Sequence, residues 1–229
     1  GDEDQLFRED YLRYYEGDIV RRDSGAYLHI TRIDNSSVEE YRPVNIFMGV
    51  DPASSTRQTA DFSTVVTVAV DKDNNRFVLP YYRNRATPLK LAEKILTQFK
   101  IYKPDKTRIE SVGYQEMLRE YIKKRCDEEN IFVPGLEIRE NPRNSKSSRL
   151  ETMEPYFAMK KTFIRKDMQE LKDELLLYPR GKHDDLLDGL YYATKRVYPP
   201  NHEDYSESSS ESSENTTKVL KIADSWLVS

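Results

Sequence analysis

The sequence predicts a mixed α/β fold in which about five main strands form one sheet with helices on both of its faces. Apolar and β-branched stretches at residues 46–50, 64–70 and 76–82 are typical of strands. Residues 71–75, Asp-Lys-Asp-Asn-Asn, have turn chemistry, which indicates that the first three strands form an antiparallel meander. Amphipathic helices and short strands then alternate as far as residue 197.

The helical part of the chain begins at Thr87, which can cap a helix with Pro88 at its first position. Ala92, Ile95 and Phe99 then fall on one face of that helix. The remaining predicted elements are a strand at residues 106–110, a helix at 114–125, a strand at 131–138, a helix at 149–160, a strand at 162–164, and helices at 168–177 and about 184–197. This order of elements indicates one sheet covered by helices.

Both ends of the chain differ from this ordered middle part. Residues 1–42 are aromatic-rich but show little periodicity, and we interpret them as a helical or irregular linker, the remnant of a connection to a preceding domain. Residues 199–229 form an acidic, serine-rich tail with a short apolar end, and we expect the tail to be disordered. The net charge is −5 for residues 1–42, +5 for residues 43–198 and −4 for residues 199–229. A modestly basic domain at residues 43–198 suits a polyanionic partner.

Composition argues against several classes of protein. No run approaches the ~18 apolar residues of a membrane span, and the first residues lack the basic and apolar parts of a signal peptide. Cys126 is the single cysteine, so the sequence has no internal disulfide, and no Cys or His cluster has the spacing of a zinc site. We therefore expect a protein of a reducing cytoplasm without a membrane partner.

Acidic residues stand where the predicted strands end and where the last helix begins. Asp51 follows the first strand, Glu110 ends the fourth strand, and Asp184 and Asp185 begin the helix. An Asp before Pro is a common turn residue and an Asp at a helix start is a common cap, so each aspartate alone has a simpler explanation. Glu is depleted in strands, however, and capping needs one carboxylate rather than two.

Carboxylates that converge at one edge of a sheet repel one another unless a cation neutralises them. Mg²⁺ and Mn²⁺ prefer oxygen ligands and keep positions for water or phosphate. Two such ions about 3.5–4 Å apart would activate a water and stabilise the leaving 3′ oxygen in phosphodiester cleavage. The acidic residues therefore predict an enzyme that uses Mg²⁺ or Mn²⁺.

Four short motifs together contain these acidic residues. The motifs are Gly-Val-Asp-Pro-Ala at residues 49–53, Asp-Phe-Ser at 61–63, Ile-Glu-Ser-Val-Gly at 109–113 and His-Asp-Asp-Leu-Leu-Asp at 183–188. As a set and in this order, they resemble the C-terminal nuclease domain of the large terminase subunit of tailed phages. The resemblance covers roughly residues 44–198 and implies an RNase H-like fold. It also implies an endonuclease that cuts concatemeric viral double-stranded DNA at the start and end of genome packaging.

The resemblance also implies roles for individual residues. The catalytic metal ligands would be Asp51, Glu110, Asp185 and Asp184. Asp185 is favoured as the direct ligand, with Asp184 supporting it. Asp61, His183 and Asp188 would support the ligands from further out. For His183 the simpler alternative is a helix cap, and for Asp188 we favour a solvated helix position over a role in the site.

Basic residues gather in the loop at residues 139–149, which carries four cations and one anion. In the terminase family this segment precedes a helix and is basic, which suits contacts with DNA phosphates. We pick Lys146 and Arg149 as phosphate contacts, with Arg143 as a third candidate. A solvated loop is the alternative for each of them.

One departure from the family concerns its ATPase. A complete large terminase has an N-terminal ATPase with a Gly-rich phosphate loop, and this sequence contains no G-x-x-x-x-G-K-[ST] pattern. We expect the chain to be the nuclease half, whose partners are double-stranded DNA, the ATPase domain, the portal protein and the small terminase subunit in the host cytoplasm. The alternatives are another RNase H-like nuclease, such as a junction resolvase or transposase, and a non-catalytic DNA-binding or assembly module.

Overall fold

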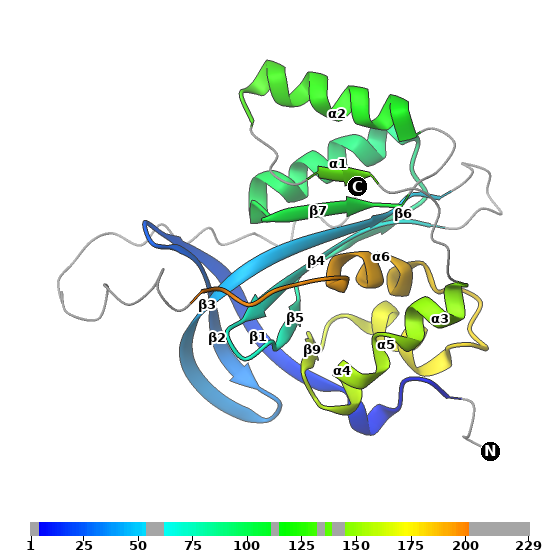
Figure 1. Cartoon of the computed structure of the whole chain (residues 1–229). Coiled ribbons are helices and arrows are strands. Elements are labelled where there is room, and N and C mark those ends of the chain that lie inside the picture. The colour runs from blue at the N-terminus through cyan, green and yellow to red at the C-terminus, as the bar shows by residue number, and fades with distance from the viewer. Residues whose placement is uncertain (1–4, 54–61, 111–114, 132–135, 139–144, 202–229) are drawn as a thin grey trace.

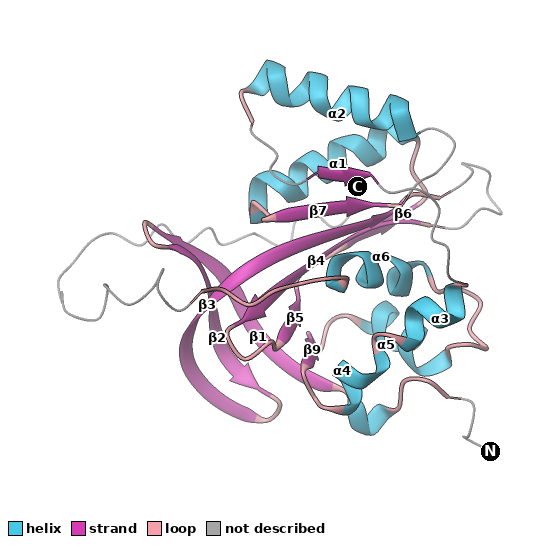
Figure 2. Ribbon diagram, in the orientation of Figure 1, coloured by secondary structure: helices cyan, strands magenta, loops and turns pink. Residues whose placement is uncertain are grey.

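The computed structural model describes residues 5–53, 62–110, 115–131, 136–138 and 145–201, which fold around one sheet (Figures 1 and 2). In these residues nine strands pair in the order β6-β4-β5-β9-β1-β2-β3-β7-β8, with a further pairing between β3 and β4. The strands are β1 Arg13–Arg22, β2 Gly25–Ile33, β3 Ser36–Asp51, β4 Ser63–Asp71, β5 Arg76–Val78, β6 Tyr82–Asn84, β7 Lys106–Ile109, β8 Leu136–Ile138 and β9 Thr162–Ile164. A 3₁₀ turn at Glu9–Tyr11 precedes the helices α1 Pro88–Tyr102, α2 Gln115–Glu129, α3 Lys146–Glu151, α4 Glu154–Ala158, α5 Gln169–Leu177 and α6 Asp185–Thr194.

The central strands confirm the predicted meander. β3 pairs antiparallel with β4, placing Asp51 opposite Thr64, and β4 pairs antiparallel with β5. On its other side β3 pairs in parallel with β7, which pairs in parallel with β8. The sheet is therefore mixed, as the sequence predicts.

Alternate residues of the central strands face opposite layers of helices. Val66, Val68 and Val70 of β4 point into a core with α5 and α6, whereas Val65 points into a second core with α1 and α2. Because successive side chains of a strand point to opposite faces, a strand buried on both faces reads as a continuous apolar run. The predicted helices on both faces of the sheet are confirmed (Figure 1).

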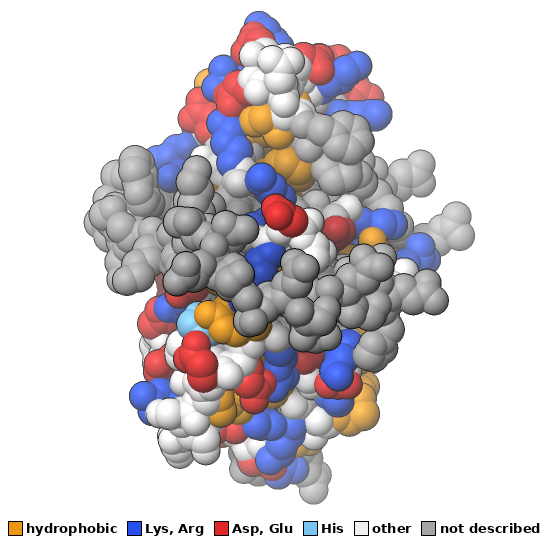
Figure 3. All heavy atoms as spheres, turned by 90° about the vertical axis from the view of Figure 1, so that its left-hand side faces the viewer, with side chains coloured by type: hydrophobic (Ala, Val, Ile, Leu, Met, Phe, Trp, Pro, Cys, Tyr) orange, Lys and Arg blue, Asp and Glu red, His pale blue; other side chains and the backbone are white. Residues whose placement is uncertain are grey.

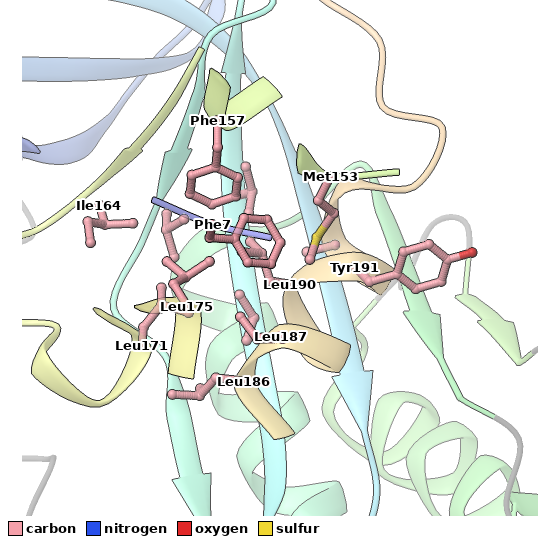
Figure 4. Close-up of a cluster of buried hydrophobic side chains, with 14 of the residues drawn as sticks. Phe7, Met153, Phe157, Ile164, Leu171, Leu175, Leu186, Leu187, Leu190 and Tyr191 are labelled. Atoms are coloured by element: carbon pink, nitrogen blue, oxygen red, sulfur yellow. The ribbon is translucent and has the colours of Figure 1, made fainter. Parts of the chain in front are cut away.

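The core beneath α5 and α6 also holds the N-terminal segment. Figure 4 shows Phe7 and Phe157 together among leucines of α5 and α6. The two rings meet edge to face with their centroids 5.0 Å apart, and Phe7 is completely buried. Burying such a side chain contributes roughly 1.5–3 kcal/mol. The segment around Phe7 is thus packed as part of the domain.

Residues 13–42 form β1, β2 and the first part of β3 with two short turns between them, and the expectation of a helical or irregular segment is wrong for them. β1 and β2 form an antiparallel hairpin, β2 pairs with the first half of β3, and β1 pairs in parallel with β9. With the pairings β3–β4, β4–β5 and β5–β9, these strands close a ring around a third core. The missed signal was the hairpin turn at Gly25, whose φ of 136° suits glycine, between two stretches rich in aromatic and β-branched residues.

Two predicted elements are divided in the structure. The strand expected at residues 76–82 becomes β5 and β6, and the break contains Pro80, which has no N–H to donate to a neighbouring strand. The helix expected at residues 149–160 becomes α3 and α4, with Pro155 in the first turn of α4. The serine-rich tail from residue 202 onward lies outside the described residues. No described helix combines the length and apolar character needed to cross a membrane.

Candidate active site

The carboxyl ends of β3 and β7 bring Asp51 and Glu110 together. β7 runs parallel to β3 with Ile109 opposite Val50, and the Glu110 N–H donates to the Val50 carbonyl oxygen over 2.9 Å. Asp51 and Glu110 therefore extend from neighbouring strand ends, and Glu110 is one of the groups that raise the pKa of the Asp51 carboxyl group.

Close packing of α6 against β3 brings Asp188 to the same edge. A Cβ atom at Gly49 would lie 2.2 Å from the Ala193 nitrogen and 2.2 Å from the Gly189 oxygen, so the backbones of strand and helix touch there. Asp188 immediately precedes this contact and is only 3% exposed. One guanidinium nitrogen, Arg149 Nη1, lies 3.2 Å from Glu110 Oε1 and 3.8 Å from Asp188 Oδ1, so the first turn of α6 lies beside the ends of β3 and β7.

Lys146, at the start of α3, joins two aspartates of the α6 N-terminus. Its Nζ donates to Asp184 Oδ1 over 2.6 Å and lies 2.5 Å from Asp188 Oδ2. Ser145 caps α3 by accepting the Ser148 N–H, which fixes the start of the helix on which Lys146 sits. The ammonium group thus bridges the two carboxylates.

Arg149, also on α3, reaches the remaining carboxylates from a buried position. Its Nη1 donates to Glu110 Oε1 over 3.2 Å and to the Tyr192 hydroxyl over 2.9 Å, and lies 3.8 Å from Asp188 Oδ1. Glu110, Asp184 and Asp188 are therefore linked through Lys146 and Arg149, and Asp51 stands beside Glu110 at the neighbouring strand end. We refer to these four residues as the carboxylate cluster: Asp51, Glu110, Asp184 and Asp188.

Burial and mutual repulsion dominate the electrostatics of the carboxylate cluster. Burial raises the pKa of Asp51 well above its usual range, and Glu110 and Asp188 raise it further while Lys146 opposes them. Burial also raises the pKa of Asp188, against the pull of Lys146 and Arg149. Burial lowers the pKa of Lys146, but the two aspartates outweigh this and the net pKa is raised. The site therefore favours additional positive charge.

Asp185, favoured from the sequence as the direct ligand, faces other groups. Its Oδ2 lies 3.9 Å from Arg83 Nη2 and 3.7 Å from His183 Nδ1, and the residue is 4% exposed. Its carbonyl oxygen accepts a hydrogen bond from the Thr64 hydroxyl over 3.0 Å, which ties α6 to β4. The His183 ring packs edge-on against Phe62. Contacts with Lys146 are made by Asp184 and Asp188.

Three residues lie in surroundings that differ from those expected. Asp188, expected at a solvated helix position, is buried within the carboxylate cluster, and its i, i+4 spacing from Asp184 was the signal that could have revealed this. Lys146 and Arg149, expected to contact DNA phosphates, face the carboxylates because α3 packs against α6. Asp61 and Arg143 lie outside the described residues.

The carboxylate cluster offers the donor chemistry of a hard divalent cation, since Mg²⁺ and Mn²⁺ prefer carboxylate oxygens. In the part of the chain that the structure describes, Lys146 and Arg149 are the cations paired with the cluster, and Asp188 Oδ1 is buried without a hydrogen-bond donor. Within the described residues no three acidic, His or Cys side chains already form a metal-binding group. Lys146 and Arg149 lie among the carboxylates, so a metal ion would have to compete with them.

Comparison with known proteins shows which family the chain belongs to. A family model described as the terminase RNase H-like domain matches residues 48–196, which contain every residue of the cluster. The chain belongs to the terminase RNase H-like domain family. No curated protein matches this terminase RNase H-like domain.

Solved phage terminase structures share the fold of this terminase RNase H-like domain. The large terminase nuclease of thermophilic phage G20c matches with a TM-score of 0.55 and 18% identity, over 85% of this chain and 100% of that chain. With bound magnesium, that nuclease matches with a TM-score of 0.55 and 19% identity, over 85% and 98%. The large terminase of a second thermophilic bacteriophage matches with a TM-score of 0.51 and 10% identity, over 68% of this chain and 41% of that chain. The likeness establishes the fold, and the family membership supports a nuclease role.

Removing the Lys146 charge from this terminase RNase H-like domain should expose the repulsion between Asp184 and Asp188. Lys146→Met keeps the length of the side chain, and we expect the Tm in EDTA to fall by about 2–4 °C, since a partly exposed ion pair contributes roughly 1 kcal/mol or less. Mn²⁺ should then raise the Tm more in the variant than in the wild type, because the ion no longer competes with the ammonium. Thermal denaturation followed by circular dichroism measures both shifts.

Lys172→Met is the matched control for this prediction, because Lys172 pairs with Glu9 on the surface. Its Mn²⁺-induced Tm shift should equal that of the wild type. An Mn²⁺ shift in Lys146→Met no larger than that of the wild type would show that Lys146 does not compete with a metal ion.

Proposed function

We propose that this chain is a metal-dependent endodeoxyribonuclease that cuts concatemeric viral double-stranded DNA while a phage genome is packaged. The observation that carries the proposal is the carboxylate cluster at the carboxyl ends of β3 and β7, inside the part of the chain that matches the family model. Buried carboxylates that repel one another cost stability unless a cation neutralises them, which favours a catalytic site over a purely structural one.

Asp51, Glu110 and Asp188 would hold the metal ion, with Asp184 supporting them from the start of α6. Two divalent ions, when bound, would activate a water molecule and stabilise the leaving 3′ oxygen of the phosphodiester. The chain itself supplies orientation, because the β3–β7 pairing holds Asp51 beside Glu110 and the contact at Gly49 holds α6 against β3. Arrangement of the ligands before the substrate arrives reduces the cost of reaching the reactive geometry.

Mg²⁺ or Mn²⁺ is the proposed cofactor, in keeping with the magnesium bound to the phage G20c nuclease. The proposed partners are double-stranded DNA, an ATPase domain of the same large terminase, the portal protein and the small terminase subunit. A nuclease that cuts DNA during packaging would act at the procapsid in the host cytoplasm.

The DNA-contacting surface is proposed only in part. On the face shown in Figure 3, the described basic and acidic side chains are interspersed. Lys146 is 38% exposed at its side chain, and Asp184 and Asp188 occupy two of its three N–H donors, so it has one donor left for a phosphate. Arg149 is buried and is better suited to orienting Glu110 than to binding DNA. Arg143 stays a candidate from its charge alone.

Metal-dependent plasmid cleavage tests the proposed function directly. The purified chain should nick and linearise supercoiled plasmid with Mg²⁺ or Mn²⁺ and be inactive in EDTA. Linear duplex should be cut as well, and a preference for four-way junctions would instead indicate a resolvase. Absence of cutting with either ion, together with retained DNA binding, would favour a binding module.

Two variants test whether Asp188 or Asp185 of α6 is the metal ligand. Asp188→Asn should reduce cleavage by about a hundredfold or more if Asp188 holds the metal, since even an outer partner of a ligand contributes about 10–100-fold. Asp185→Asn should have the larger effect if the sequence-based choice is right. The ratio of the two cleavage rates therefore decides between them.

A further inference from the structure

Helix α6 receives its N-terminal cap from another helix. Asp184 occupies the N-cap position, but its carboxylate accepts no hydrogen bond from the N–H groups of α6. Instead Glu174 Oε2, on α5, accepts the Leu186 N–H over 2.8 Å and the Leu187 N–H over 3.3 Å. An aspartate at the N-cap ordinarily accepts such bonds itself. At α6 this task has passed to Glu174.

Glu174 is held in this role by its surroundings. The residue is 6% exposed, and its Oε1 lies 3.3 Å from Arg83 Nε. Arg83 is fixed in turn by Glu170, whose Oε1 lies 2.9 Å from Arg83 Nη1. The positive end of the helix dipole also attracts the Glu174 carboxylate. Two backbone donors and a guanidinium thus keep one buried carboxylate at the start of α6.

The cap supplied by Glu174 leaves the Asp184 carboxylate available elsewhere. It accepts a hydrogen bond from Lys146 Nζ over 2.6 Å, and the same ammonium lies against Asp188. The Asp184 carboxylate would have to turn away from Lys146 in order to accept hydrogen bonds from the first N–H groups of α6. The Asp184 side chain can therefore either cap α6 or contact Lys146, and these two orientations compete.

We infer that Glu174 is a positioning residue for the carboxylate cluster: it caps α6 in place of Asp184 and so keeps the Asp184 carboxylate turned toward Lys146 and Asp188. Without an acceptor at position 174, Asp184 is placed to take over the cap, as N-cap aspartates do. The consequence for metal binding rests on the proposed function, whereas the consequence for capping does not.

A double-mutant cycle on stability tests the capping step. Urea unfolding is measured for wild type, Asp184→Ala, Glu174→Met and the double variant, at a pH above the Glu174 pKa, which burial raises to about 7. Asp184→Ala should change the folding equilibrium constant little in the wild-type background. In the Glu174→Met background it should lower that constant by about five- to tenfold, the effect of losing an N-cap. Equal effects of Asp184→Ala in both backgrounds would overturn the inference.

Conservative variants keep the cycle interpretable. Glu174→Gln retains an acceptor oxygen, so Asp184→Ala should again have its small wild-type effect there. Glu170→Met is the matched control, because Glu170 lies on the same helix and pairs with Arg83 but accepts no N–H of α6. If Glu174→Met does not fold, Glu174→Leu serves as the second variant without an acceptor and must show the same dependence on Asp184.

Calorimetric titration measures the Mn²⁺ affinity, which would not change if Glu174 only stabilised the fold. Glu174→Met should weaken Mn²⁺ binding by roughly tenfold, and Asp184→Ala should then weaken it no further, because Asp184 has already left the cluster. Unchanged Mn²⁺ affinity in Glu174→Met would overturn the positioning role. A wild-type chain that binds no Mn²⁺ would overturn the proposed function instead, and the urea cycle would still decide whether Glu174 replaces Asp184 as the cap.

Discussion

Asp51→Asn is expected to abolish metal-dependent cleavage of plasmid DNA while the domain stays folded. Asp51 ends β3 beside Glu110, and an amide in its place removes a negative ligand from the candidate metal site. The rate should fall by more than about a hundredfold, since even an outer partner of a metal ligand contributes about 10–100-fold. Agarose-gel cleavage assays with Mn²⁺, calibrated by dilution of the wild type, measure the loss.

Asp51→Asn should also raise the free energy of unfolding when the protein is measured in EDTA. Burial, Glu110 and Asp188 all raise the pKa of Asp51, so the ionised form is disfavoured in the folded chain and a neutral amide relieves this. Asp173→Asn is the matched control, because Asp173 is exposed on α5 and bonds only a surface glutamine side chain in the described structure. Normal cleavage by Asp51→Asn would remove Asp51 from the site.

Gly49→Ala is expected to destabilise the domain by about 3 kcal/mol or more, the upper end of the usual range for overpacking. The added methyl group would lie 2.2 Å from backbone atoms of α6 at Gly189 and Ala193, and backbone atoms cannot turn aside as a side chain can. The helix would have to move away from β3. Urea unfolding measures the loss of stability.

Displacement of α6 should also weaken the candidate metal site, because Asp188 travels with the helix while Asp51 stays on β3. Whatever fraction of Gly49→Ala folds should therefore bind Mn²⁺ more weakly than the wild type. Gly181→Ala is the control, since its added Cβ would come no closer than 3.2 Å to another atom. Wild-type stability in Gly49→Ala would mean that β3 and α6 do not pack as closely as the structure indicates.

Local sequence signals predicted much of the fold correctly. Thr87 accepts the Lys90 N–H at the start of α1, as its place before Pro88 predicts. The meander of β3, β4 and β5 follows from the apolar stretches and the turn at residues 71–75. Such features depend on neighbours a few residues away, which a sequence displays directly.

The strands at residues 13–33 were missed because their apolar periodicity is weak. β1 pairs with β2, which follows it directly in the sequence, and with β9, which lies far along the chain. A strand buried in a ring on one side and partly exposed on the other mixes polar and apolar residues in an uneven pattern. The pairing of β1 with β9, which closes the ring, leaves little trace in the local sequence, whereas the hairpin of β1 and β2 could have been found from its turn.

The sequence alone determined which residue types stand at the strand ends: Asp51 after β3 and Glu110 after β7, in motifs of the terminase nuclease family. It also determined that α6 begins with several aspartates. Only the tertiary structure decided that Asp184 and Asp188 meet Lys146, that Arg149 turns inward to Glu110, and that Glu174 caps α6. The physical reason is that the side chains at the start of a helix turn toward the charges and hydrogen-bond partners of neighbouring helices. At α6 these partners belong to α3 and α5, which are separate helices earlier in the sequence.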